Sequence, residues 1–203
     1  MNILKGTRSG APNSLQITGT DLEIARLMSS DPTNVYSAQD SFTTSSWSST
    51  EYQEATILKI KASAPALTTL IGKTISSVIV SLYRTGGYSA EGGAVYARRV
   101  LRTAVNAQVT WDSYSTGNAW GTAGAQGAAD VDLSIVLGAI GLTDTVTAMF
   151  TSSTSDMVTT VTNWVSGSYA NNGMLLFPSF FADYHTFSGP AGANPPIITV
   201  TYS

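Results

Sequence analysis

Short runs of β-branched and aromatic residues alternate with breaks of Gly, Ser and Asn from Val35 to the end of the chain. The clearest run covers residues 74–83, where a period of two places Val78, Val80 and Leu82 on one face of an expected central strand. Further strands are predicted at residues 57–61, 94–101, 108–111, 129–133, 145–150, 173–177 and 196–202. The pattern predicts an all-β fold, an antiparallel jelly-roll or β-sandwich domain over residues 33–203.

One segment departs from the period of two. Met157, Val161 and Trp164 recur at helical spacing after Ser155, and Gly167 follows at a position where helices commonly end. The spacing predicts one short amphipathic helix near residues 156–166.

Residues 1–32 differ from the rest of the chain because they are rich in Gly, Ser, Thr, Asn and Pro. The apolar patch in this segment contains Leu22, Ile24, Leu27 and Met28. So polar a segment does not fold alone, and we expect an extended N-terminal arm whose apolar patch is buried against a neighbouring subunit. A homo-oligomer is therefore predicted, and removal of residues 1–30 is expected to leave a folded monomer.

Charge and composition narrow the class of partner. The chain has ten Lys and Arg against thirteen Asp and Glu, and this net charge of −3 argues against nucleic acid, whose phosphates attract basic surfaces. It contains no cysteine, which excludes disulfides, thiolate metal sites and cysteine nucleophiles. The longest apolar stretch, residues 131–142, is shorter than the roughly 20 residues that cross a bilayer, so no membrane insertion is expected.

The candidate catalytic groups do not form a recognisable set. His185 is the only histidine, no Gly-X-Ser-X-Gly motif accompanies it, and we expect it at a strand edge or in a loop. Asp130 and Asp132 share one face of an expected strand, where they could hold Ca²⁺ or form a glycosidase pair, but a solvated strand edge is the favoured interpretation. We therefore predict no enzyme, no cofactor and no metal site.

Several segments occur in an order that resembles one known family. They comprise residues 74–83, Val95-Tyr96, Val109-Thr110-Trp111, residues 161–167 (VTNWVSG), residues 171–176 (NNGMLL) and residues 196–202. Over about residues 34–203 the chain resembles the DNRLRE (disaggregatase-related) domains, which are grouped with the family 96 carbohydrate-binding modules. The resemblance implies a non-catalytic β-jelly-roll of the kind found in secreted polysaccharide-active proteins, cell-surface proteins and phage structural proteins.

Aromatic side chains are the best candidates for a binding surface, because the C–H faces of sugars stack on flat rings. Trp111 and Trp164 lie inside the family motifs and are expected to pack in the interior. Aromatic residues in the expected loops are freer to meet a ligand, and an arginine could meet an acidic polysaccharide through charge-assisted hydrogen bonds. The predicted glycan-binding residues are Tyr88, Arg98, Tyr114 and Trp120.

Two interpretations of the function remain open, both without catalysis. The first is a structural protein of a virion, a phage capsid decoration or tail-associated subunit, whose partners are other virion subunits and for which a polysaccharide is an optional ligand. The second is a carbohydrate-binding module or adhesin domain of a secreted, extracellular protein. We favour the virion interpretation, because the sequence starts at Met1 without a secretory signal and because repeated copies strengthen weak contacts by multivalency.

Overall fold

The computed structural model describes residues 12–37, 39–46, 52–88, 93–141, 149–178 and 183–203. Within these ranges the chain is built mainly from strands, with two α-helices. The strands are β1 (Asn13–Thr18), β2 (Leu22–Met28), β3 (Ser41–Ser46), β4 (Gln53–Ile60), β5 (Ile75–Tyr88), β6 (Ala94–Arg99), β7 (Ser113–Ser115), β8 (Asn118–Ala119), β9 (Gly138–Gly141), β10 (Met149–Ser152), β11 (Met174–Pro178), β12 (Asp183–Ser188) and β13 (Ile197–Tyr202). The helices are α1 (Pro65–Leu70) and α2 (Ser155–Ser166).

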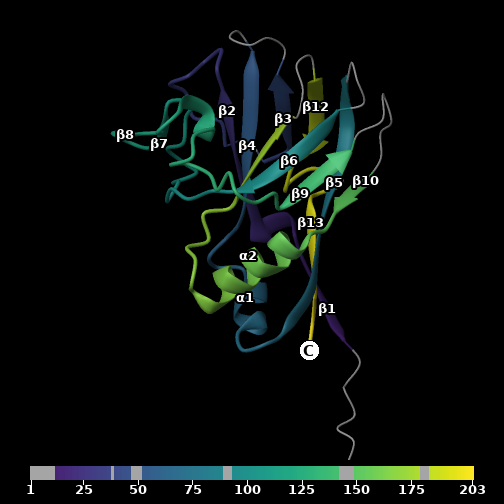
Figure 1. Cartoon of the computed structure of the whole chain (residues 1–203). Coiled ribbons are helices and arrows are strands. Elements are labelled where there is room, and N and C mark those ends of the chain that lie inside the picture. Colours follow the sequence, from purple (N-terminus) through teal and green to yellow (C-terminus); the bar gives the residue numbers. More distant parts are fainter. Residues whose placement is uncertain (1–11, 38, 47–51, 89–92, 142–148, 179–182) are drawn as a thin grey trace, which may run out of the picture.

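Eleven strands form one strongly curled antiparallel sheet, which gives the all-β sandwich that the sequence predicts (Figure 1). The order is β1-β13-β5-β12-β3-β4-β11-β6-β9, with β10 added to β5 and β2 added to β4. The long strand β5 joins the two halves, because its first part pairs with β13 and its last part with β12. The expectation of a central strand at residues 74–83 is confirmed.

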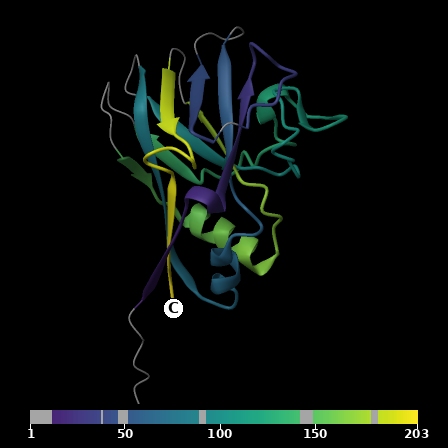
Figure 2. The same ribbon diagram turned by 180° about the vertical axis from the view of Figure 1, so that it is seen from behind.

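A large apolar core fills the interior of the curled sheet. Val78, Val80 and Leu82 of β5 point into it, as the period of two predicts. Helix α2 lies against one end of this core (Figures 1 and 2), where it buries Met157 and Trp164. The predicted helix is therefore confirmed. No helix in the described part of the chain is long and apolar enough to cross a membrane.

The ends of α2 explain its length. The side chain of Thr154 accepts a hydrogen bond from the backbone N–H of Met157 and caps the first turn. Gly167 ends the helix with a φ of +78°, a conformation that glycine adopts without a steric penalty. The shorter helix α1 was not predicted; it starts at Pro65 and buries Ala66 and Leu70.

A second, smaller core lies on the outer face of β2, β4 and β11. Strand β4 is buried on both faces, since Leu58 points into the large core and Ile57 into the small one. Residues 100–137, here named the 100–137 connection, cover this outer face with Trp111, Trp120 and Val131. The packing role predicted for Trp111 is confirmed, and the 100–137 connection becomes part of the domain although most of it is neither helix nor strand.

The prediction of an extended arm is wrong for the described residues 12–32. Strand β1 pairs with β13, and β2 pairs with β4 along its full length. Leu22 and Ile24 enter the large core and Leu27 enters the small one, while Met28 is half-buried at the end of β2. Successive side chains of β2 thus point to opposite faces of the sheet, and each face packs against one of the two cores of the same chain. The apolar residues of β2 are therefore buried without a neighbouring subunit. Residues 1–11 lie outside the described residues.

Some predicted strands are not strands. Residues 108–111 follow a turn in which the N–H groups of Gln108 and Val109 both donate to the carbonyl of Val105, and they pair with no strand in the described part of the chain, although Val109 and Trp111 enter the small core. Residues 129–133 contribute only an isolated bridge between Val131 and Val100. Of the predicted strand at 145–150, residues 145–148 lie outside the described residues and the remainder belongs to β10.

Gly124 offers a test of how tightly the 100–137 connection packs. Its φ is +76°, and a Cβ atom there would lie 2.5 Å from the ring of Trp111. Gly117 has a φ of +78° but no atom within 4 Å of such a Cβ, so the two glycines share their backbone conformation and differ in packing. Gly124→Ala is expected to lower the free energy of unfolding by about 2 kcal/mol more than Gly117→Ala, because the indole must move. Denaturant unfolding of both variants measures the difference, and equal losses would contradict it.

Candidate functional site

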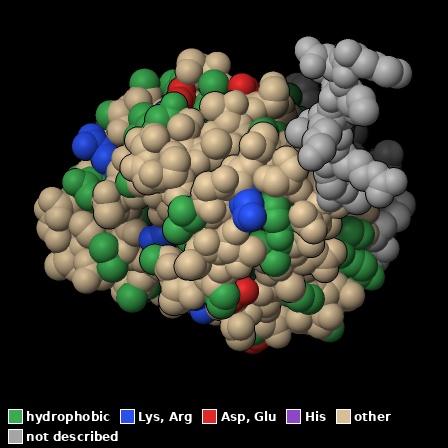
Figure 3. Space-filling model, turned by 90° about the horizontal axis from the view of Figure 1, so that it is seen from below, with side chains coloured by type: hydrophobic (Ala, Val, Ile, Leu, Met, Phe, Trp, Pro, Cys, Tyr) green, Lys and Arg blue, Asp and Glu red, His purple; other side chains and the backbone are tan. Residues whose placement is uncertain are grey.

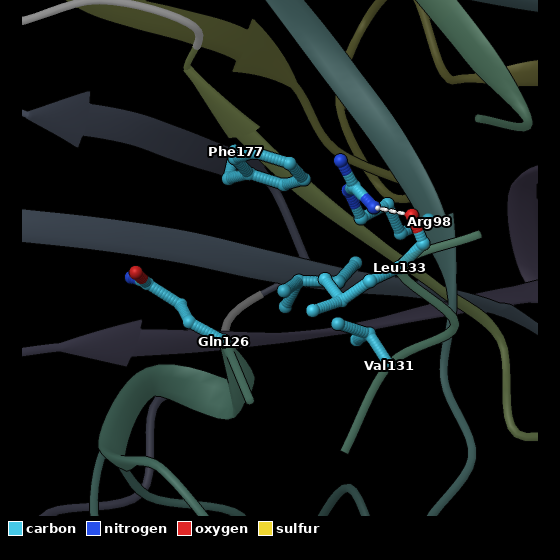
Figure 4. A pocket seen from close by; sticks show the side chains of 6 residues that line it. Arg98, Gln126, Val131, Leu133 and Phe177 are labelled. Carbon is cyan, nitrogen blue, oxygen red and sulfur yellow. Dashed lines mark hydrogen bonds between the residues drawn. The ribbon is translucent and has the colours of Figure 1, made fainter. Parts of the chain in front are cut away.

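A shallow groove lies on the outer face of β6 and β11, with the 100–137 connection as its other wall (Figure 4). The register of the two strands places Arg98 opposite Leu175 and Tyr96 opposite Phe177, so the four side chains share one face. The hollow has a volume of about 140 Å³. Its lining residues are Arg98, Gln126, Val131, Leu133, Leu175 and Phe177.

The hollow continues past Gln126 and Phe177 into a second one of about 60 Å³. The additional lining residues are Ser45, Ser46, Gln53, Glu54 and Pro178. The amide nitrogen of Gln126 donates a hydrogen bond of 3.2 Å to the amide oxygen of Gln53 and so joins the two walls. Because the two hollows share Gln126 and Phe177, we treat them as one site and call it the β11 groove.

The first hollow combines an apolar floor with an aromatic ring and a cation. The Phe177 ring is 6.0 Å from the ring of Tyr96, and the guanidinium of Arg98 lies over Phe177 at 5.7 Å from its centroid. Arg98 also donates a hydrogen bond of 2.8 Å to the carbonyl oxygen of Leu133, drawn as a dashed line in Figure 4. These two contacts hold the guanidinium at the groove while leaving most of its five N–H groups for a ligand.

The charge of Arg98 distinguishes it from the neighbouring arginines. Arg26 pairs with Glu54, Arg99 with Asp132 and Arg102 with Asp130. Within the described residues, no carboxylate lies within ion-pair distance of Arg98. The β11 groove therefore contains one positive charge that has no acidic partner among the residues that the structure describes.

Asp130 holds the 100–137 connection in place, and the expected solvated strand edge is wrong for it. The carboxylate is fully buried and accepts hydrogen bonds of 2.8 Å from the backbone N–H groups of Gly121 and Thr122. The guanidinium of Arg102 lies 3.5 Å away. Because each oxygen is committed to the backbone of its own loop, the role of Asp130 is to position the wall of the groove that contains Val131.

The carboxylate of Asp132, two residues later, is also held by hydrogen bonds to residues of its own chain. It accepts hydrogen bonds from the hydroxyl of Ser134 at 2.5 Å and from the guanidinium of Arg99 at 2.7 Å. These contacts, that of Ser134 foremost, lower the pKa of Asp132 below its ordinary value. Asp130 and Asp132 thus have separate structural partners and do not face each other across a cleft as a glycosidase pair would.

Of the predicted glycan-binding residues, Arg98 lines the β11 groove and the others do not. Trp120 is buried, donates its indole N–H to the carbonyl of Thr110 and packs against Tyr114, so the expectation that it is exposed is wrong. Tyr88 is 51% exposed but lies at the end of β5, opposite Tyr184 of β12, and does not line the groove. The structure therefore does not bring these four residues into one surface.

The sole histidine is also placed differently from the expectation of a loop or strand edge. His185 is fully buried in β12, between the neighbouring strands β3 and β5. Asp183 and Arg84 are likewise fully buried on these strands. Among the residues that the structure describes, no three acidic or histidine side chains gather into a cluster that could hold a metal ion.

The surface elsewhere is poor in charge, as the composition predicts. In the view of Figure 3, from below, Lys, Arg, Asp and Glu side chains are few and scattered among uncharged polar atoms. An arginine without an acidic partner, as Arg98 is within the described ranges, is therefore a distinctive feature of this charge-poor surface.

Comparisons with protein-family models and with curated protein sequences give no match for this chain. The function is therefore inferred from the chemistry of the β11 groove.

Proposed function

We propose that this protein is a carbohydrate-binding β-sandwich whose ligand is a polysaccharide lying along the β11 groove, with an acidic sugar at Arg98. The observation that carries the proposal is the grouping of Phe177, Tyr96 and Arg98 on one face of two adjacent strands, where Arg98 has no acidic partner in the described part of the chain. A flat ring offers a stacking surface for the C–H face of a sugar, and a guanidinium matches a carboxylate or sulfate with two parallel hydrogen bonds.

The polar residues of the groove suit the hydroxyl groups of a sugar chain. Gln53 and Gln126 present amide groups, and Ser46 presents a hydroxyl beside them. An amide donates and accepts hydrogen bonds at once, as each sugar hydroxyl also does. The ligand would thus stack at Phe177 and be held by these amides further along.

The shape of the groove favours binding of a chain over enclosure of a small molecule. Its two hollows, of about 140 and 60 Å³, are smaller than the roughly 300–1,000 Å³ typical of pockets that bury a small ligand. The single carboxylate among its lining residues, Glu54, is paired with Arg26 at 3.1 Å. Hydrolysis of a glycosidic bond ordinarily needs two carboxyl groups flanking that bond, so we propose binding without catalysis.

The proposal is tested by titrating the full chain with polygalacturonate, which carries carboxylates, and with neutral mannan, by isothermal calorimetry. Arg98→Gln is expected to weaken polygalacturonate binding roughly tenfold to a hundredfold, because this is the change in dissociation constant that follows the loss of one charge-assisted hydrogen bond. Phe177→Ala is expected to weaken the binding of every glycan that the wild type binds, because stacking does not depend on charge.

Two control variants sit outside the groove. Lys73→Gln removes the same charge from an exposed position, and Tyr88→Ala removes an exposed ring at the end of β5. Both are expected to bind as the wild type does. If Tyr88→Ala abolishes binding and Phe177→Ala does not, the ligand lies at the ends of β5 and β12 and not in the β11 groove; if the wild type binds no polysaccharide on a glycan array, the proposed function fails.

A second candidate function is a structural subunit of a virion, such as a phage capsid decoration or tail-associated protein. The predicted assembly arm does not support this candidate, because Leu22, Ile24 and Leu27 are buried within their own chain. The observation that favours it is the edge strand β1, which contains no charged residue and pairs on one side with β13. An open edge of this kind suits a protein that works in repeated copies.

A further inference from the structure

Four strands, β1, β2, β9 and β10, lie at the margins of the large sheet. The outer edges of β2, β9 and β10 are covered by other residues of the chain. The free edge of β2 is occupied by a side chain, because the amide of Gln39 donates to the carbonyl of Ile24 at 3.1 Å and accepts from its N–H at 3.2 Å. The N–H of Arg26 on the same edge donates to the carbonyl of Tyr36 at 2.8 Å. This edge has thus no room for a further strand.

Strands β9 and β10 cover one another. They contact each other, and the N–H of Ala139 in β9 donates to the hydroxyl of Ser152 in β10 at 3.1 Å. Both strands have four residues, too few to offer a long edge.

Among the residues that the structure describes, no segment covers the outer edge of strand β1. Within the described residues, its backbone makes hydrogen bonds to β13 and to no other segment. It lies beside β13 at the border of the sheet, as both views show (Figures 1 and 2). Its six residues, NSLQIT, include no charge and no proline, the two devices that usually protect an edge.

We propose that the edge of β1 pairs antiparallel with β1 of a second copy of this chain, which joins the two sheets across a two-fold axis. A strand paired with its own copy satisfies the outward N–H and C=O groups of both copies at once and closes the assembly as a dimer. The absence of charge on β1 removes the repulsion that a self-paired edge would otherwise suffer. Pro12, directly before β1, has no N–H to donate to such a pairing.

The faces of β1 restrict the register of this pairing. Leu15 and Ile17 face inward, opposite Val200 and Ile198 of β13. Strands that share an inner face must place inward residues opposite inward residues. The two-fold axes that meet this condition and also pair five of the six residues of β1 pass through Leu15 or through Gln16. In the first register Gln16 lies opposite Ser14 of the copy, and in the second it lies opposite Gln16.

This geometry defines a pair of variants that cover both registers. In Ser14→Lys/Gln16→Lys a lysine faces a lysine across the axis whichever register forms, and Ser14→Glu/Gln16→Glu does the same with glutamates. Each variant alone is expected to raise the dimer dissociation constant at least tenfold in sedimentation velocity. An equimolar mixture of the two is expected to recover the dimer, because the lysine at position 16 then faces a glutamate in either register.

The full wild-type chain of 21.2 kDa is expected to sediment as a dimer that dissociates on dilution. The control Thr159→Lys/Thr162→Lys adds the same charge to exposed positions of α2 and is expected to leave the dimer unchanged. A wild type that stays monomeric at the highest soluble concentration overturns the proposal. So does a dimer that survives in both charged variants, or a mixture that stays monomeric. None of these outcomes depends on whether the β11 groove binds a polysaccharide.

Discussion

A chain that begins at Ser29 is expected to lose its cooperative thermal unfolding transition, because the deletion removes β1 and β2 from the sheet. Four large and fully buried side chains go with them: Ile17, Leu22, Ile24 and Leu27. Loss of one such side chain typically costs about 2–5 kcal/mol, so the sum of four reaches the roughly 5–15 kcal/mol by which a whole domain is stable. Circular dichroism of the full and shortened chains during heating measures the effect.

Two point variants in β2 test whether the loss of stability depends on how deeply the replaced side chain is buried. Ile24 is fully buried and Met28, at the end of the same strand, is half-buried. Ile24→Ala is expected to lower the free energy of unfolding by about 2–5 kcal/mol, and Met28→Ala by about 1 kcal/mol. A shortened chain that still melts cooperatively, or equal losses in the two point variants, would mean that residues 13–28 are not an integral part of the core.

Replacement of Asp130 by alanine is expected to have the second largest effect and to act on stability and ligand binding together. The change leaves the backbone N–H groups of Gly121 and Thr122 without their acceptor and removes the partner of Arg102. Loss of a buried, charged acceptor typically costs about 3–5 kcal/mol. Since the neighbouring residue Val131 forms part of a groove wall, binding of any glycan that the wild type binds is expected to fall as well.

Asp112→Ala provides the control for this variant. Asp112 lies in the same 100–137 connection, but its side chain is exposed and no hydrogen bond to it is found within the described residues. Its replacement is expected to change the free energy of unfolding by no more than about 0.5 kcal/mol. Urea unfolding of both variants, followed by titration with polygalacturonate, measures the two effects. If Asp130→Ala is as mild as Asp112→Ala, the carboxylate does not hold the loop.

The β11 groove was predictable only in part. The alternation of Tyr96 with Arg98 in β6, and of Leu175 with Phe177 in β11, is visible in the sequence and places each pair on one strand face. Nothing in the sequence indicates that these strands are neighbours or that Gln53 and Gln126 meet at 3.2 Å across them. The aromatic loop residues Trp120 and Tyr114 looked exposed for the same reason, because the small core that they help to build has no periodic signal of its own.

The sequence by itself determined the elements whose burial follows a regular period: β5, β13 and helix α2. Apolar residues recur every second position in the strands and every third or fourth position in the helix. Such a repeat shows that one face of the element is buried, whichever elements form the core on that face. Only the tertiary structure decided how β2, the 100–137 connection and Asp130 are buried. Leu22 and Leu27 of β2 point into different cores, and Asp130 is buried because two N–H groups of its own loop face it. In each case burial depends on partners far away in the chain or on a particular loop geometry, and local periodicity contains neither.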